Sequence, residues 1–223
     1  MGNRAIVKPV GKNIGVYLHW NGGRDSVEPF LEYCKLKGYQ PFETDYGLAR
    51  FCQVVSNFFG GSLCIGVQTN IYMAEESARG LDNGIYEVKG WEIVRRYPSK
   101  PFEQHTHNRL EMLIGIDKCQ PPKERLGAGY FKAKLVIAGE LKIGDRVYIE
   151  TGLDTEVPKA WPVLGVGENR IVNGRNVVGV PYVGRFCAED PASNPNNYLW
   201  AKDWNGETKM YRKVCRGRSK KHV

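Results

Sequence analysis

The residues best suited to chemistry lie in one short turn: His19, Trp20, Asn21, Gly22, Gly23, Arg24 and Asp25. Such a turn could bind an anion, because Gly22 and Gly23 would present backbone N–H groups and Arg24 would add positive charge next to a helix N-terminus. The opposing interpretation is that Trp20 is a core residue and that the turn only links a strand to a helix. Neither a Walker pattern nor a complete GxGxxG accompanies the turn, which favours the second interpretation.

Catalysis at this turn is a weaker hypothesis than binding. His19 could pair with Asp25 or Cys52, but a catalytic dyad depends on hydrogen-bond geometry that a sequence does not supply. A second histidine cluster, His105 and His107 with Glu103 nearby, has the form of a small metal clip. No third or fourth ligand is identifiable. We therefore predict no catalytic residue, no metal site and no cofactor.

Basic and aromatic residues alternate through the second half of the chain. Lys132, Lys134, Lys142 and Arg146 are followed by Trp200 and Trp204. The C-terminal run adds Arg216, Arg218, Lys220 and Lys221. Cations that neutralise phosphates, together with rings that stack on bases, are typical of a nucleic-acid surface. The alternative is that the aromatic rings fill a β-barrel and the lysines form its wet face.

The net charge of +8 is unevenly distributed. Residues 1–118 carry 14 Lys and Arg against 13 Asp and Glu, whereas residues 119–223 carry 18 against 11. The second half therefore holds +7 of the total, which indicates a polyanionic partner for that half.

The first half is expected to be an α+β domain spanning residues 1–119, with mixed strands and two or three amphipathic helices. One helix is expected to follow Ser26 as its N-cap and to end at Gly38, and a second to start near Thr44 or Asp45 and end at Gly60. Asn108 is expected to cap a short helix. Strands are expected at residues 3–9, 13–20, 62–69, 85–89 and 91–97.

Residues 120–126 contain two prolines and several charges, and are the best candidate for a linker. Residues 127–215 are expected to form a mostly-β domain, a small barrel or sandwich, followed by a basic tail at 216–223. Strands are expected at 130–137 and 146–151, with pairs at 170–172/177–182 and 198–204/208–214. The segment GELKIGDRVYI resembles the opening of SH3-like and translation-factor barrels.

The composition of the chain bears on its expected cellular location and on the state of its cysteines. Neither a run of eighteen apolar residues nor a signal-peptide h-region is present, so we expect a cytoplasmic protein without a membrane partner. The six cysteines form no CxxC pair, and most have apolar neighbours, which favours reduced and buried thiols.

The opening MGNRA followed by VYLHWNGG and LARFCQVVSNFFGG resembles small uncharacterised proteins of phages, prophages and other mobile elements, notably of gut Firmicutes. A wider phage group shares YxHWDG after an MGTR-like start. That group has Asp at the position of Asn21, so its replacement here points to recognition rather than catalysis. The resemblance implies a mobile-element accessory protein, a class that often includes anti-defence factors.

We therefore expect a non-enzymatic protein that binds nucleic acid or a host nucleoprotein complex, most concretely an anti-CRISPR-type inhibitor in a bacterial host cell. One alternative is a nucleotide sponge or nucleotide-processing enzyme that uses the turn from His19 to Asp25. A second alternative is a structural or oligomerisation module. The sequence leaves the oligomeric state open.

Overall fold

The computed structural model describes residues 2–61, 64–98, 106–148, 160–167, 170–172, 175–177, 180–183, 199, 201 and 207–215. The chain divides into two compact units, Met1–Arg125 and Leu126–Val223. The division falls inside the segment 120–126 that the sequence marks as a linker. Among the described residues, none of the helices is long and apolar enough to cross a membrane.

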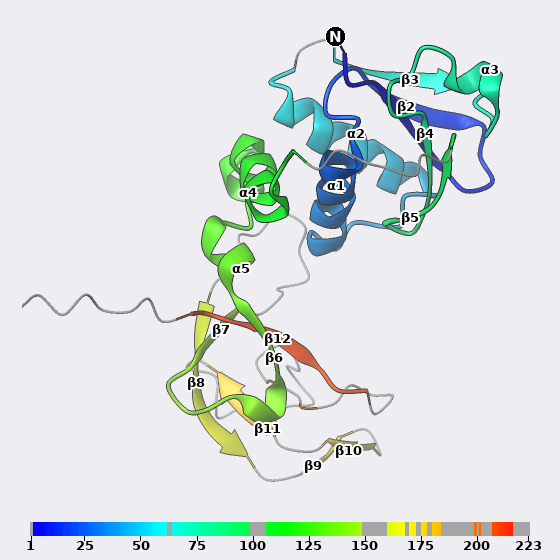
Figure 1. Ribbon diagram of the computed structural model, residues 1–223. Helices are drawn as coiled ribbons and strands as arrows, with labels where there is room; N and C mark the ends of the chain where they lie inside the picture. Colours follow the sequence, from blue (N-terminus) through cyan, green and yellow to red (C-terminus); the bar gives the residue numbers. More distant parts are fainter. Residues whose placement is uncertain are drawn as a thin grey trace, which may run out of the picture. The chain divides into compact units, whose positions relative to one another are not determined.

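The first unit is a mixed sheet with helices, as predicted (Figure 1). Its elements are β1 (Ala5–Pro9), β2 (Ile14–Leu18), α1 (Arg24–Leu36), α2 (Asp45–Phe58), β3 (Ile65–Thr69), α3 (Glu75–Ala78), β4 (Ile85–Lys89), β5 (Glu92–Tyr97), α4 (Arg109–Cys119) and η1, a 3-10 turn (Pro122–Glu124). α3 is a single short turn of four residues between β3 and β4.

The sheet has the order β3-β2-β1-β4-β5. β1 and β2 lie where two of the strands were expected and form an antiparallel hairpin, with Val7 opposite Val16. β4 joins β1 in parallel and continues into the antiparallel β5. β1 is therefore a central strand, which agrees with its five consecutive buried residues.

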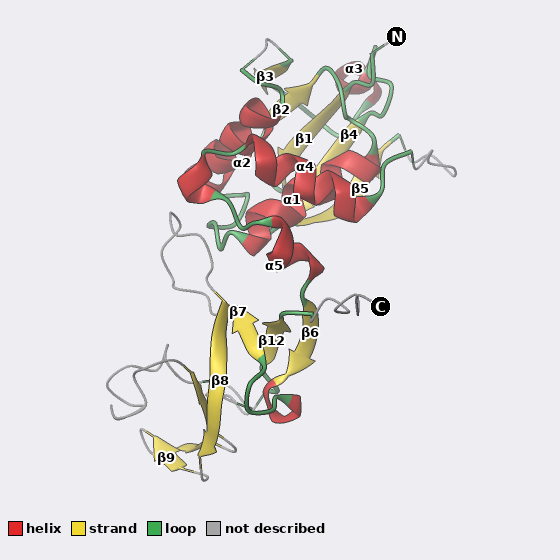
Figure 2. Cartoon of the chain, turned by 90° about the vertical axis from the view of Figure 1, so that its left-hand side faces the viewer, coloured by secondary structure: helices red, strands yellow, loops and turns green. Residues whose placement is uncertain are grey.

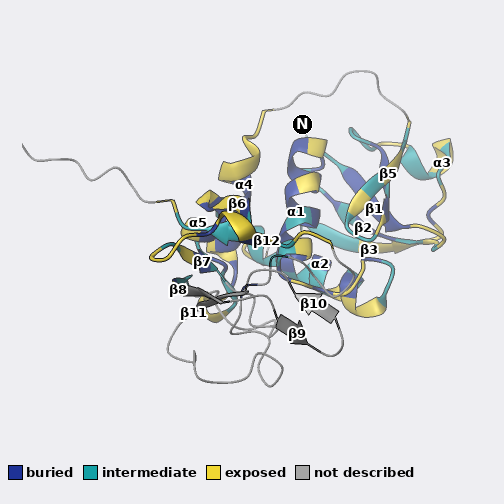
Figure 3. Cartoon of the chain, turned by 90° about the horizontal axis from the view of Figure 1, so that it is seen from below, coloured by how far each residue is buried: buried dark blue, intermediate teal, exposed yellow. Residues whose placement is uncertain are grey.

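The helices α1 and α2 cover one face of this sheet, and α4 packs across them on the side away from the strands (Figures 1 and 2). Buried and exposed residues alternate in bands along α1, as an amphipathic helix requires (Figure 3). The interior contains an aromatic cluster in which the ring of Phe30 lies edge-on to Phe51 and Phe58. Tyr33 of α1 donates a buried hydrogen bond of 2.9 Å to Asp117 of α4, which joins the two helices.

Side-chain capping explains where α2 and α4 begin. Asn108 accepts from Leu110 and Glu111, so this predicted cap is confirmed. Thr44 accepts a hydrogen bond from the Gly47 N–H, and α2 starts at Asp45, which agrees with the predicted start near Thr44 or Asp45. The prediction for α1 is wrong: its N-cap is Gly23 and the helix begins at Arg24. Ser26 therefore lies inside the first turn of α1 and is fully buried.

The second unit is mostly β, as predicted. Its elements are α5 (Ala128–Lys132), β6 (Lys134–Ile137), η2 (Ala138–Glu140), β7 (Arg146–Tyr148), β8 (Ala160–Gly167), β9 (Arg170–Val172), β10 (Arg175–Val177), β11 (Val180–Val183) and β12 (Met210–Lys213). β6, β12, β7 and β8 form an antiparallel sheet, and β11 adds to the edge at β8. β9 and β10 form a separate two-stranded ribbon.

The register of this sheet sorts its side chains onto two faces. Val136 and Tyr211 are directly opposite, as are Val147 and Trp161, so all four share one face. Together with Val163, Leu141 and Leu199 they form the core of the second unit. In the part of the chain that the structure describes, β6 and β11 remain the two edges of the sheet, and no closed barrel is formed.

Two expectations for this unit are wrong. Tyr130 and Lys132 belong to the short helix α5 rather than to a strand, because Gly127 turns the chain with a φ of 87° and Tyr130 packs its ring on Tyr148. The predicted strand 177–182 is split between β10 and β11, which pair with different partners. β12 pairs with β6 and β7. Of the expected pair 198–204/208–214, the Lys209 N–H donates to the Ala201 carbonyl at 2.9 Å, and residues 198, 200 and 202–204 lie outside the described residues.

The cysteines are less uniformly buried than the sequence suggests. Cys34 is buried, Cys52 and Cys64 are partly buried, and Cys119 and Cys215 are exposed; all five are free thiols. Burial raises the pKa of the Cys34 thiol well above its usual value.

Candidate functional site

The turn between β2 and α1 packs against the start of the chain. The Gly22 N–H donates to the Asn3 carbonyl at 2.8 Å, and the Asn3 N–H donates to the His19 carbonyl at 3.2 Å. A Cβ atom at Gly22 would lie 2.5 Å from the Asn3 oxygen, so only glycine fits there. Asn21 has a φ of 54°, a left-handed conformation that asparagine tolerates well. Residues 3–5 and the turn at residues 19–23 thus pack against each other.

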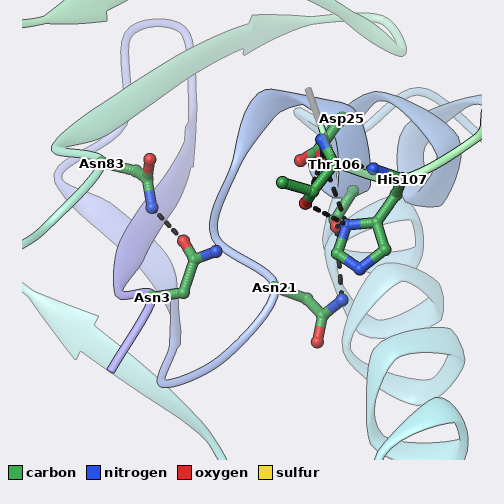
Figure 4. Close-up of polar contacts among 7 residues, drawn as sticks. Asn3, Asn21, Asp25, Asn83, Thr106 and His107 are labelled. Atoms are coloured by element: carbon green, nitrogen blue, oxygen red, sulfur yellow. Dashed lines mark hydrogen bonds and ion pairs between the residues drawn. The ribbon is translucent and has the colours of Figure 1, made fainter. Parts of the chain in front are cut away.

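Asp25 is the most engaged polar residue of the turn. Its Oδ2 accepts hydrogen bonds from the backbone N–H groups of Thr106 at 2.9 Å and His107 at 3.0 Å (Figure 4). The side chain of Asp25 is only 5% exposed. Burial raises its pKa, but the hydrogen bonds from His107 and Thr106 and the charge of His107 outweigh burial and leave the pKa below its usual value. Asp25 therefore ties the segment before α4 to the start of α1.

Ser26, His107 and Asp25 lie together, but they do not have the geometry of a catalytic triad. His107 Nδ1 is 3.1 Å from Asp25 Oδ2 and 3.3 Å from Ser26 Oγ, so the carboxylate and the hydroxyl both face the same ring nitrogen. A triad needs them on opposite nitrogens, with an accessible hydroxyl. Ser26 is fully buried and also accepts from the Asn21 amide at 3.3 Å. The hydrogen bonds of this cluster stabilise the turn, and its geometry does not suit nucleophilic attack on a substrate.

The remaining groups of the turn also have internal partners. Arg24 forms an ion pair with Glu28 at 2.5 Å along α1. His19 Nδ1 lies 3.0 Å from the Tyr17 hydroxyl, and its ring is edge-on to Trp20, which is exposed rather than in the core. The carboxylate of Asp25 already supplies negative charge in the first turn of α1. Anion binding at this turn stays a prediction.

Only His107 of the possible metal-binding cluster Glu103, His105 and His107 is among the described residues. Glu103 and His105 lie outside the described residues, and His107 is engaged with Asp25. Among the residues that are described, His, Cys, Asp and Glu nowhere gather in groups of three that could hold a metal ion.

A groove of about 530 Å³ lies on the first unit, between α1, α4 and the start of β5. Leu31, Leu36, Trp91 and Ile93 contribute apolar surface to it. Its six charged side chains form three ion pairs: Arg24 with Glu28, Lys35 with Glu92 and Arg109 with Glu32. This groove was not predicted, because its walls come from segments far apart in the chain.

A groove of about 490 Å³ in the second unit brings together three lysines: Lys134, Lys142 and Lys213. Lys134 and Lys213 are directly opposite on β6 and β12 and therefore project from the same face of the sheet. Val136, Ile143 and Val214 supply apolar lining, and Glu140 and Asp145 supply the carboxylates. Two of these lysines were predicted from sequence, and Lys213 was missed.

The charges of this second groove are only partly matched. Lys213 pairs with Asp145 at 2.7 Å, and the same carboxylate accepts from the Lys142 backbone N–H at 2.9 Å. The side chains of Lys134 and Lys142 are exposed and form no ion pair within the described part of the chain. Like charges directly opposite on a sheet repel, and the carboxylate of Asp145 beside Lys213 offsets part of the repulsion between Lys134 and Lys213.

The other predicted binding residues are not in this groove. Lys132 is exposed on α5. Arg146 lies on β7 and donates to the Ala160 carbonyl at 2.7 Å. Six more lie outside the described residues: Trp200, Trp204, Arg216, Arg218, Lys220 and Lys221.

Comparisons with known proteins do not assign this chain to a family. No protein-family model matches the sequence, and neither the curated proteins nor the solved structures give a significant match.

Proposed function

We propose that this chain is a non-enzymatic nucleic-acid-binding protein and that the groove of the second unit contacts the phosphate backbone. The observation that carries the proposal is the convergence of Lys134, Lys142 and Lys213 from three separate segments onto one groove. Ammonium groups gathered without an equal number of carboxylates attract a polyanion, whose condensed counterions are released on binding.

The wider charge distribution supports the same proposal. Residues 119–223 hold 18 basic and 11 acidic residues, whereas the first half is nearly neutral. Lys132 is exposed on α5 just before β6, and its carbonyl accepts from the thiol of Cys215, a groove residue, at 3.4 Å. The polar groups of the turn at residues 19–25 are occupied by internal contacts, which favours the second unit over the first as the binding element.

The biological setting is a further part of the proposal and rests on the resemblance to mobile-element proteins. In that setting a nucleic-acid-binding accessory protein of a phage would act on a host nucleoprotein complex, and inhibition of a CRISPR-type defence complex is the most concrete form. The charge of the second unit would place it against the nucleic-acid component of such a complex.

Fluorescence anisotropy of labelled DNA and RNA oligonucleotides with the full chain, over a series of salt concentrations, tests the proposal. We expect affinity to fall steeply with salt, and to fall further in a Lys132→Met/Lys134→Met variant or after removal of residues 216–223. Binding that is indifferent to salt, or the absence of binding, would overturn it. A thermal-shift panel of mononucleotides distinguishes the sponge alternative, because a ligand that binds only the folded state raises the unfolding midpoint.

A further inference from the structure

The shape of the lysine groove constrains which form of nucleic acid it can take. The lysines line a hollow of about 490 Å³ rather than a protruding helix or ribbon. Duplex DNA presents a convex backbone, and proteins usually read it by inserting a helix or a β-ribbon into a groove of the duplex. A single strand is thin and flexible enough to enter a basic hollow and follow it.

The apolar lining points the same way. Ile143 is 68% exposed, in the turn between η2 and β7, and it lines the groove next to Lys142. Val136 and Val214 continue this apolar lining. The base faces of a duplex are stacked on one another and cannot cover an exposed isoleucine, whereas an unpaired base can.

We infer that the groove binds a single-stranded segment of nucleic acid, with its phosphates at Lys134, Lys142 and Lys213 and an unpaired base against Ile143. This inference rests on the proposed function and specifies its ligand. A phosphate near Lys134 would add to the carboxylate of Asp145, which already offsets part of the repulsion between the opposed Lys134 and Lys213.

The test compares a homothymidine single strand with a hairpin duplex of the same phosphate number, both labelled, against the full chain. We expect the single strand to bind about tenfold more tightly, the effect of roughly one base contact. Ile143→Ser should lose most of that preference without changing the salt dependence, because no charge is removed. Ile143→Trp should tighten binding of the single strand, because a ring gives a base a larger surface.

The matched control is Val67→Ser, which removes a 58% exposed side chain from β3 of the first unit and should change neither affinity. Equal binding of both oligonucleotides with steep salt dependence would overturn this inference and leave the proposed function standing. An unchanged single-strand affinity in both Ile143 variants would also overturn it. If neither oligonucleotide binds, the proposed function itself fails.

Discussion

The first unit has a groove of about 530 Å³ and the second has one of about 490 Å³, and three basic side chains line each of them. In the first unit every one of these cations pairs with a glutamate of the same groove. In the second unit only Lys213 pairs with a groove carboxylate, and Lys134 and Lys142 extend into solvent. The two grooves thus have similar volumes but differ in how many of their cations are paired with carboxylates. Of the two, the second groove is therefore the better candidate for attracting an anion.

The largest expected effect separates the two grooves directly. Lys134→Met/Lys142→Met should weaken single-strand binding and reduce the slope of log K against log salt by about 1.4, since each phosphate contact contributes about 0.7. The matched control, Lys35→Met/Arg109→Met, removes the same charge from the first groove and should leave binding almost unchanged. Anisotropy titrations over a salt series measure both. Equal losses in the two variants would mean that net charge, not the groove, governs binding.

A second variant tests whether the first unit serves mainly as a packed scaffold. Gly22→Ala places a Cβ atom 2.7 Å from the Ala5 N and Cβ atoms, besides its clash with Asn3, and should destabilise the first unit by about 1–3 kcal/mol. Gly66→Ala is the control, because its Cβ would meet only Tyr17 at 4.0 Å. Urea denaturation gives both stabilities. A Gly22→Ala protein as stable as the wild type would contradict the close packing of the turn on the N-terminus.

A third variant addresses the role of Asp25. Asp25→Asn should cost about 2 kcal/mol at neutral pH, because the buried carboxylate accepts charge-assisted hydrogen bonds from the segment before α4. The folded pKa of Asp25 lies below the usual 3.8, so its contribution is complete above pH 3.8 and is lost as pH falls through the folded pKa. Stability curves of both proteins should therefore converge in acid. Loss of nucleic-acid binding without loss of stability would instead indicate a functional turn.

A smaller effect is expected at the exposed pair of Arg4 and Asp82. The hydrogen bonds from Arg4 lower the pKa of Asp82 to about 2. The stability that this pair contributes should be present above pH 3.8 and decline toward pH 2, and Asp82→Asn should cost less than Asp25→Asn. Urea denaturation between these pH values measures it. An Asp82→Asn cost equal to that of Asp25→Asn would show that burial does not set the size of these contributions.

Local signals predicted the parts of the fold that depend on neighbouring residues. Asn108 caps α4 as expected, α2 starts directly after Thr44, and the glycines at 60 and 61 follow α2. The predicted start of α1 was wrong because Ser26, a residue type that often serves as an N-cap, is instead buried beside His107, a residue 81 positions away. A preference for capping was overridden by a tertiary contact.

Long-range pairing is what the sequence could not supply. Lys134 and Lys142 were identified from local basic and aromatic composition, but their convergence with Lys213 depends on β12 pairing with β6. The sequence suggested a different, local hairpin for that strand, because short-range turns are visible in a sequence and strand register is not. The same limitation concealed the contact between Asp25 and His107.

Lysine acetylation footprinting of the full chain, with and without a homothymidine strand, tests the central claim most directly. The acetylation rate of each lysine is measured separately in the wild-type protein, so no variant is needed. The difference between the two grooves predicts that the strand slows acetylation of Lys134 and Lys142 and leaves the exposed Lys35 unchanged. Equal protection of Lys35, or unchanged acetylation of Lys134 and Lys142 under conditions where the strand binds, would contradict it.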